Sequence, residues 1–206
     1  MLAYKFRSVE QLHYVLDIIF NNRLYCADSK ELNDPSESLY GWSDGTHCYC
    51  GNNSEIDRGL SNFRICSLSG TWENPPLWGH YASGFTGVAI AIELPDNLEN
   101  IKKVEYICNI FPTVFIDDST EIDTCCKQIL FSKNREWRYE QEIRIVHKDQ
   151  WFNLSPGAIK RIILGPRIDP SLFQMFKIIC QKKKIELNKL GIGDESFDLD
   201  SVIQRE

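Results

Sequence analysis

Polar and apolar residues alternate most informatively in residues 137–146, which read WRYEQEIRIV. The alternation predicts a strand, and a strand would place Glu140, Glu142 and Arg144 on one face because successive side chains point to opposite sides. The two carboxylates would lie about 7 Å apart, from a rise of roughly 3.3 Å per residue, with the guanidinium holding at least one of them ionised. Such a row can divide binding and chemistry between its members. A solvent-facing strand with ordinary charge alternation has the same pattern.

Other segments have the short apolar runs of strands or the spacing of amphipathic helices. Residues 87–94 are almost continuously apolar, as expected of a strand buried on both faces. The remaining predicted strands are 4–7, 24–27, 64–69, 104–108, 113–116, 159–164 and 185–190. Helices are predicted at 8–22, in the short segment after Pro75, at 122–130 and from Asp169 onward, with capping residues at the first and last of these.

This order contains strands with interspersed helices but no regular βαβ alternation. It predicts an α+β fold, a single domain with a mixed or mostly antiparallel sheet and flanking helices. The length of 206 residues and the hydrophobic content of 43% suffice for one core, which we assign to residues 1–190. Residues 191–206 are acidic and poor in large apolar groups, so we expect a partly ordered tail. Residues 41–59 are rich in Gly, Asn, Ser and Asp and predict a long loop.

Charge and cysteine content restrict the partners and the cellular compartment that we expect for the protein. The net charge of −6 argues against a broad basic footprint for duplex nucleic acid. The first residues are polar too early for a secretory signal, and no apolar run approaches the roughly 18 residues of a membrane span. We therefore expect a cytoplasmic protein without a membrane partner. The eight cysteines are scattered through a chain that can form a core without disulfide bonds, which favours reduced thiols.

One local cluster resembles a set of metal ligands. His47, Cys48 and Cys50 lie within four residues. A tetrahedral site needs a second pair of ligands at suitable spacing, and the chain offers none. No bound metal is expected.

Two further groups of residues have both a functional and a structural interpretation. Asn33, Asp34 and Glu37 could form a polar edge of an active site, or a capped turn, because Asn-Asp-Pro is strong turn chemistry. Trp78, His80 and Tyr81 could form a stacking wall for a flat ring. Alternatively, the tryptophan and the tyrosine anchor the core and the histidine is exposed.

Six short sequence blocks follow one another along residues 4–170. They are YKFR at 4–7, the L-Y to L-N-D-P-x-E segment at 24–37, the Cys-x-Ser strand at 66–69, W-x-H-Y followed by G-V at 78–88, W-x-Y-E-x-E-x-R at 137–144, and ILGP at 163–166. Taken together and in this order, the blocks resemble the bacterial family catalogued as domain of unknown function 2971. The resemblance implies a set of positions rather than a reaction.

The layout is also similar, more distantly, to the ADP-ribosyltransferase fold of NAD-consuming toxins. In that superfamily an Arg or His on the first strand holds the dinucleotide, a Ser or Tyr on a middle strand orients the nicotinamide ribose, and a Glu on a late strand is catalytic. The resemblance implies these roles for Arg7, Ser67 and Glu142, with Glu140 orienting the acceptor. The chain departs from the usual Ser-Thr-Ser run, because it has Ser-Leu-Ser from residue 67.

The resemblance implies an enzyme that cleaves the nicotinamide glycosidic bond of NAD and transfers ADP-ribose to a nucleic-acid or protein acceptor. Such an enzyme would use NAD as its substrate, without a metal, and could act as a toxin or phage-defence effector with an immunity protein as partner. The residue types suit this chemistry, since a carboxylate stabilises an oxocarbenium-like state and an Arg binds pyrophosphate. We expect Arg7, Glu140 and Glu142 to point into one concavity, with Ile143 and Ile145 facing the core.

Two other functions remain open. A metal-dependent nuclease could use Asp34, Glu37, Glu140 and Glu142, although Arg7 and Arg144 would bring positive charge to its site. A non-catalytic sensor could bind a nucleotide in the same pocket. The residues assigned to the pocket are Arg7, Asn33, Asp34, Glu37, Ser67, Trp78, His80, Tyr81, Glu140, Glu142 and Arg144.

Overall fold

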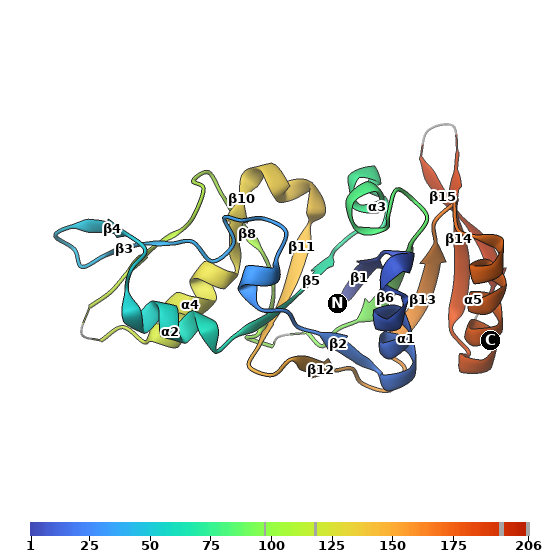
Figure 1. Ribbon diagram of the computed structural model, residues 1–206, viewed down its shortest axis with the longest axis horizontal. Helices are drawn as coiled ribbons and strands as arrows, with labels where there is room; N and C mark the ends of the chain where they lie inside the picture. The colour runs from blue at the N-terminus through green and yellow to red at the C-terminus, as the bar shows by residue number, and fades with distance from the viewer. Residues whose placement is uncertain (97, 118, 194–195, 205–206) are drawn as a thin grey trace. The chain divides into compact units, whose positions relative to one another are not determined.

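A computed structural model describes residues 1–96, 98–117, 119–193 and 196–204 (Figure 1). The chain forms two compact units. Unit 1 comprises Met1–Leu24, Leu68–Asp96 and Asn153–Glu206, and unit 2 comprises Tyr25–Ser67 and Asn97–Phe152. The predicted α+β class with a large, mostly antiparallel sheet is confirmed. Within the described residues, no helix has the length and apolar character needed to cross a membrane.

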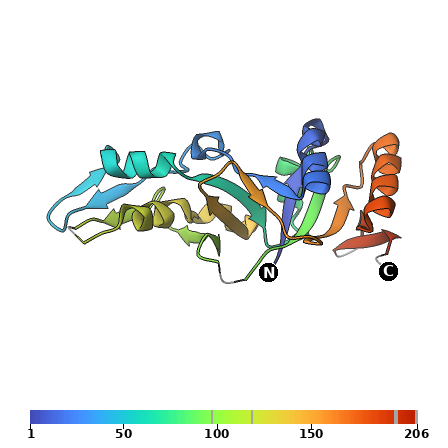
Figure 2. The ribbon, with the colours of Figure 1, turned by 90° about the horizontal axis from the view of Figure 1, so that it is seen from below.

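Unit 1 contains a sheet whose only parallel pair joins β13 to β14 among the pairings of its described strands. Its strands, in spatial order, are β15 (Phe197–Ile203), β14 (Glu186–Ile192), β13 (Ile159–Leu164), β6 (Val88–Glu93) and β1 (Leu2–Arg7). Its helices are α1 (Leu12–Asn21), preceded by the 3-10 turn η1 (Val9–Gln11), α3 (Pro75–Tyr81) and α5 (Pro170–Lys183). Figure 2 shows α1 and α5 on the same side of these strands.

The central strands of unit 1 carry the core that the sequence predicts. All of β6 except Glu93 is buried, in keeping with its continuous apolar run. Tyr4 and Phe6 of β1 pack with Leu77 and Trp78 of α3, and the rings of Phe6 and Trp78 meet edge to face with centroids 5.2 Å apart.

Unit 2 is built around β11 (Glu142–His147), which lies beside β5 (Arg64–Ser69) and pairs antiparallel with β7 (Ile101–Lys103). Smaller sheets join β3 (Gly41–Ser43), β4 (Cys48–Cys50) and β9 (Thr113–Phe115), and β8 (Glu105–Ile107) with β10 (Ser132–Asn134). A further pair joins β2 (Arg23–Tyr25) to β12 (Trp151–Asn153), and each of these two strands includes residues of both units. The helical segments are η2 (Ser29–Glu31), α2 (Ser54–Ser61), α4 (Ile122–Leu130) and η3 (Arg135–Glu140).

Helices α2 and α4 lie side by side and enclose one hydrophobic core of unit 2 (Figures 1 and 2). Ile56 and Leu60 of α2 pack with Cys126 and Ile129 of α4 in this core. The contact requires a residue without a side chain, because a Cβ on Gly59 would lie 2.6 Å from the Cys126 sulfur.

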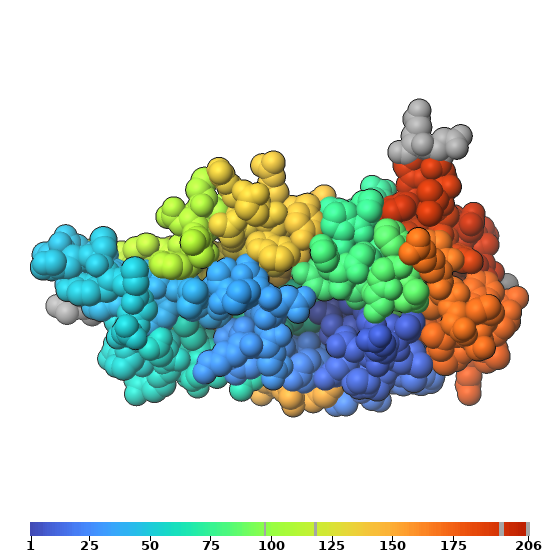
Figure 3. All heavy atoms as spheres, turned by 45° about the horizontal axis from the view of Figure 1, so that its top comes forward, coloured from blue at the N-terminus to red at the C-terminus, as the bar shows by residue number. Residues whose placement is uncertain are grey.

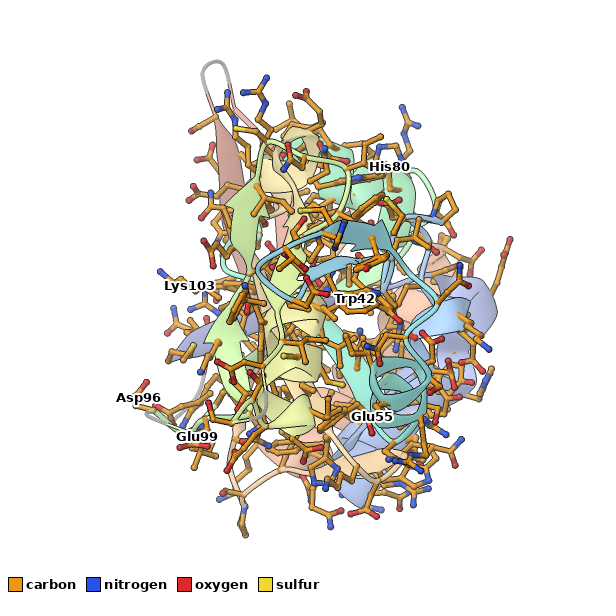
Figure 4. The ribbon with its side chains drawn as sticks, turned by 90° about the vertical axis from the view of Figure 1, so that its left-hand side faces the viewer. Trp42, Glu55, His80, Asp96, Glu99 and Lys103 are labelled. Atoms are coloured by element: carbon orange, nitrogen blue, oxygen red, sulfur yellow. The ribbon has the colours of Figure 1, made fainter. Side chains whose placement is uncertain are left out.

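The structure corrects three predictions about local elements. Residues 137–140 belong to η3 rather than to the following strand, since Asn134 caps η3 and Gln141 ends it in the left-handed region, at φ 46°. The segment 41–59 is not a long loop. It forms the hairpin β3–β4, which carries Trp42 (labelled in Figure 4) stacked on Tyr49, and then α2, whose first N–H groups are capped by Asn53.

The acidic C-terminal segment also differs from the partly ordered tail that its composition predicts. Its residues 197–203 form β15, which pairs antiparallel with β14. Alternation explains this: Phe197 and Leu199 pack against the core of unit 1, while Asp198 and Asp200 are exposed.

Candidate functional site

Five charged side chains converge inside unit 2. None of them is more than 7% exposed. They are Glu37 in the turn after η2, Lys133 on β10, Glu140 at the end of η3, and Glu142 and Arg144 on β11. Figure 3 shows the blue segment that contains residues 33–39 beside the yellow surface of η3. Buried charges persist in a fold only when they are paired, so these contacts determine how the surrounding segments meet.

The ammonium group of Lys133 lies among three carboxylates. Its Nζ donates hydrogen bonds to Glu140 Oε2 at 2.7 Å and to Glu142 Oε2 at 2.9 Å, and lies 3.5 Å from Glu37 Oε1. The ring of Trp137 covers it, with its centroid 5.0 Å from Nζ. Carboxylates and an aromatic face together form an enclosure suited to a positive charge.

Arg144 connects the same carboxylates to the backbone. Its Nε donates to Glu142 Oε1 at 2.6 Å, and its Nη2 donates to Glu37 Oε1 at 2.5 Å. Its Nη1 donates to the Leu130 carbonyl at 2.6 Å. Only the branched, planar guanidinium can reach three separate acceptors in this way.

Glu142 receives two further restraints, one from β5 and one from β8. The hydroxyl of Ser67 on β5 donates a hydrogen bond to its carboxylate. Its backbone N–H donates to the Tyr106 hydroxyl on β8 at 2.8 Å. Ser67 therefore helps to hold the carboxylate, and Tyr106 holds the backbone that carries it.

Burial and the neighbouring charges shift the pKa values of Glu142 and Glu37 in opposite directions. Burial alone would raise the pKa of Glu142, but the charges of Arg144 and Lys133 outweigh it and lower the pKa to about 2. For Glu37, burial is the dominant effect, so its pKa is raised despite the contact with Arg144. Burial would lower the pKa of Lys133, but the three carboxylates raise it, so the lysine stays charged.

Glu140 and Glu142 lie close together, but the strand alternation that predicts this is not the reason. They do not share a strand face, because η3 ends at Glu140 and the left-handed Gln141 separates it from β11. They meet at Lys133 instead. The expectation for Ile143 and Ile145 is met, since both are buried.

The remaining candidates of unit 2 have simpler surroundings. Asp34 accepts hydrogen bonds from the backbone N–H of Ser36 at 2.8 Å and from its hydroxyl at 2.7 Å, which is the local pattern of a capped turn. Asn33 is exposed. Of the Asn-Asp-Pro block and its neighbours, Glu37 alone contributes a charge to the buried network.

The other candidates belong to unit 1. Trp78 is fully buried and its Nε1 donates to the Trp72 carbonyl at 2.7 Å, so it anchors the core rather than forming a stacking wall. His80 is exposed at the end of α3 (Figure 4), and Tyr81 packs against the same core. Arg7 ends β1, with its guanidinium 5.4 Å from the centroid of the Tyr14 ring. A cleft shared by Arg7 and Glu142 would join the two units and stays a prediction.

Two members of the site were missed by the sequence analysis. Lys133 is on β10, seven residues before Glu140 at the end of η3, and Tyr106 is on β8, so no single helix or strand joins either residue to the predicted row of charges. The sequence around Lys133 has no motif that predicts a buried lysine. Only the folded structure shows that this side chain belongs to the site.

No cluster with the character of a metal site is found in the described part of the chain. There, no group of three or more His, Cys, Asp or Glu residues is arranged to hold a metal ion. Cys48 and Cys50 are exposed free thiols on β4. Among the three carboxylates of the buried network, the Lys133 ammonium supplies a positive charge.

Comparison of the chain with protein-family models, with curated proteins and with solved structures finds no match. The resemblances drawn from the sequence blocks therefore stay predictions.

Removing Arg144 tests whether the network holds unit 2 together. Arg144→Met leaves the Glu37 and Glu142 carboxylates buried without their shared cation, so we expect a loss of about 3–5 kcal/mol in the free energy of unfolding. Arg135→Met is the control, because Arg135 is 58% exposed and should change stability by less than about 0.5 kcal/mol. Urea denaturation monitored by tryptophan fluorescence measures both. Equal, small losses would show that the network contributes little to stability.

The opposite pKa shifts predict the order in which the two carboxyls titrate. The folded pKa of Glu142 lies below its ordinary value of 4.5, so its ionisation stabilises the fold above pH 4.5 and this stabilisation is lost as pH falls through about 2. Glu37 has the opposite sign, since its raised pKa makes its contribution complete at low pH and smaller as pH rises through the folded value. Carboxyl ¹³C NMR should show Glu37 protonating first while Glu142 stays ionised for as long as the protein is folded. Protonation of Glu142 before Glu37 would contradict this assignment.

Proposed function

We propose that the protein is an ADP-ribosyltransferase-like enzyme that cleaves the nicotinamide glycosidic bond of NAD and transfers ADP-ribose to a macromolecular acceptor. The observation that carries the proposal is the hydrogen bond from Ser67 on β5 to the ionised Glu142 at the start of β11. The resemblance assigns a Ser on a middle strand and a Glu on a late strand to the nicotinamide ribose. The chain order of Arg7, Ser67 and Glu142 on β1, β5 and β11 agrees with that assignment.

The proposed reaction breaks the bond between ribose C1′ and the pyridinium nitrogen. The bonding electron pair leaves with neutral nicotinamide, and positive charge develops on C1′ and the ring oxygen. The acceptor nucleophile then bonds to C1′ and loses its proton. Glu142 would stabilise the oxocarbenium-like state by its negative charge and by accepting a hydrogen bond from a ribose hydroxyl.

The charge of the network suits this task. Glu37, Glu140 and Glu142 bring three negative charges when ionised, against the two positive charges of Lys133 and Arg144. The excess negative charge lies away from water, where its effect on a developing positive charge is stronger than at the surface. In the low-pKa Glu142, the charge is present throughout the neutral range.

Lys133 connects the surface of unit 2 to Glu142, which is where the substrate would reach the carboxylate. It lines a depression on the surface of unit 2 together with Glu37, and its Nζ contacts Glu142 directly. A ribose hydroxyl that takes the place of Nζ at Glu142 Oε2 would meet an ionised acceptor held in position by Arg144. Glu140 shares Nζ with Glu142 and is the member suited to orienting the acceptor.

We also propose a biological role for this activity. NAD consumption with a nucleic-acid or protein acceptor suits a toxin or phage-defence effector, held in check by an immunity partner. The nuclease alternative loses support because Lys133 lies among the carboxylates that it requires. A nucleotide sensor would bind in the same place without turnover.

The reaction is tested by replacing one carboxylate at a time. Glu142→Gln should reduce nicotinamide release from NAD by about 10²–10³-fold, the scale seen when one preorganised electrostatic group is removed. Glu140→Gln should impair transfer to the acceptor more than NAD cleavage. Nicotinamide is measured by chromatography, with and without nucleic-acid and protein acceptors.

Glu136→Gln is the matched control, since Glu136 is an exposed residue of the same 3-10 segment as Glu140 and should leave both rates unchanged. Circular dichroism establishes that each variant is folded. Cleavage of DNA or RNA that depends on a divalent metal and is indifferent to NAD would refute the proposal in favour of a nuclease.

A further inference from the structure

A depression on unit 2 opens beside the buried network and has unused hydrogen-bonding capacity. Its lining includes Ser38, Glu37 and Lys133, with Leu39 and Ile110 among the apolar members. The Ser38 hydroxyl oxygen is buried and has no hydrogen-bond partner. A buried polar group without a partner is costly, and in a native structure it points to a bound water or ligand.

The space and the charges restrict what can enter. The cavity volume of about 10 Å³ admits one group the size of a water molecule. An ammonium group would meet Lys133 with like charge, and a carboxylate would meet Glu37 with like charge. A hydroxyl suits both neighbours, because it can donate to the Glu37 carboxylate and accept from the Lys133 ammonium or from Ser38.

The surroundings of the cavity favour a ligand that has a carbon-bearing face beside its hydroxyl, as the C–H face of a sugar ring provides. Leu39 is 48% exposed and Ile110 is 66% exposed, and both line the depression. Large exposed apolar residues beside a convergent polar group are a common arrangement of ligand sites. The ligand would insert one hydroxyl and cover the two side chains with its carbon skeleton.

We propose that Ser38, Glu37 and Lys133 form a subsite for one ribose hydroxyl of a dinucleotide, with Leu39 and Ile110 covering the adjacent sugar. The inference rests on the proposed function, in which a ribose hydroxyl of NAD reaches Glu142. Lys133 Nζ contacts Glu142 and lies 3.5 Å from Glu37, so neighbouring hydroxyls of one ribose could reach both carboxylates.

Binding of ADP-ribose, which has no glycosidic bond to nicotinamide, tests the subsite separately from turnover. Ser38→Ala removes only the hydroxyl, and Ser38→Gly removes it while suiting the positive φ of 68° at this position. We expect each to weaken ADP-ribose binding roughly tenfold in calorimetry, the scale of one lost hydrogen bond. Ile110→Ser should weaken binding too, whereas Ile192→Ser, at an exposed isoleucine of unit 1, should not.

Analogues of ADP-ribose identify the group that enters the cavity. With the 2′-deoxy and 3′-deoxy forms of the terminal ribose, we expect one of the two to bind roughly tenfold more weakly than ADP-ribose to the unaltered protein, and to show no such difference in Ser38→Gly. This result supports the subsite. No binding of ADP-ribose, or binding that is unchanged in both Ser38 variants and in Ile110→Ser, overturns it.

The two proposals can fail separately. Binding of ADP-ribose that depends on Ser38, without nicotinamide release from NAD, would retain the subsite and reject the enzyme. Nicotinamide release with a KM for NAD that is unaltered by Ser38→Gly and Ile110→Ser would retain the enzyme and reject the subsite.

Discussion

The structure of unit 2 depends on the pairing of buried charges. Lys133 and Arg144 are removed from water, and each is tolerated because it pairs with Glu142, which is near in the sequence, and with Glu37, which comes from a distant part of the chain. Glu37 and Arg144 are 107 positions apart in the sequence and are joined by a direct hydrogen bond. Since an unpaired charge at any of these places would be costly, the turn after η2, β10, the end of η3 and β11 are held to one mutual arrangement.

The same pairing gives chemically similar side chains different properties. Glu142 is kept ionised by the cations beside it, while burial makes Glu37 easier to protonate. Environments that separate the pKa values of neighbouring carboxyls are a recurrent feature of sites that perform acid, base or electrostatic tasks. Structural ion networks can shift pKa values as well, so the hydrogen bond from Ser67 to Glu142 is the more specific sign of function.

Local sequence patterns predicted the elements whose character is set locally. The apolar run of β6 and the capped starts of η1 and α5 are examples, because burial on both faces and N-cap chemistry can be predicted from short segments. The end of η3 could not be predicted, since a left-handed conformation at Gln141 is uncommon for a residue other than glycine. Lys133 could not be predicted either, because its partners Glu37, Glu140 and Glu142 lie on other elements of the fold.

In the candidate site too, local patterns predicted some residues correctly and left the role of others open. Glu142 and Arg144 are two residues apart and were grouped by strand alternation, and both are in the network. Trp78 was equally compatible with a ring-binding wall and a core anchor, because sequence alone does not state what a side chain packs against. Its full burial and its hydrogen bond to Trp72 decide for the core.

The central claim is that Ser67 and Glu142 act together on the ribose of NAD, and a double-mutant cycle on nicotinamide release tests it most directly. Ser67→Ala should slow release by itself because it removes a hydrogen bond that positions the Glu142 carboxylate. In the Glu142→Gln background, where the ionised partner is absent, the same substitution should add little. Losses that are simply additive, or a Ser67→Ala variant with an unchanged rate, would contradict the account.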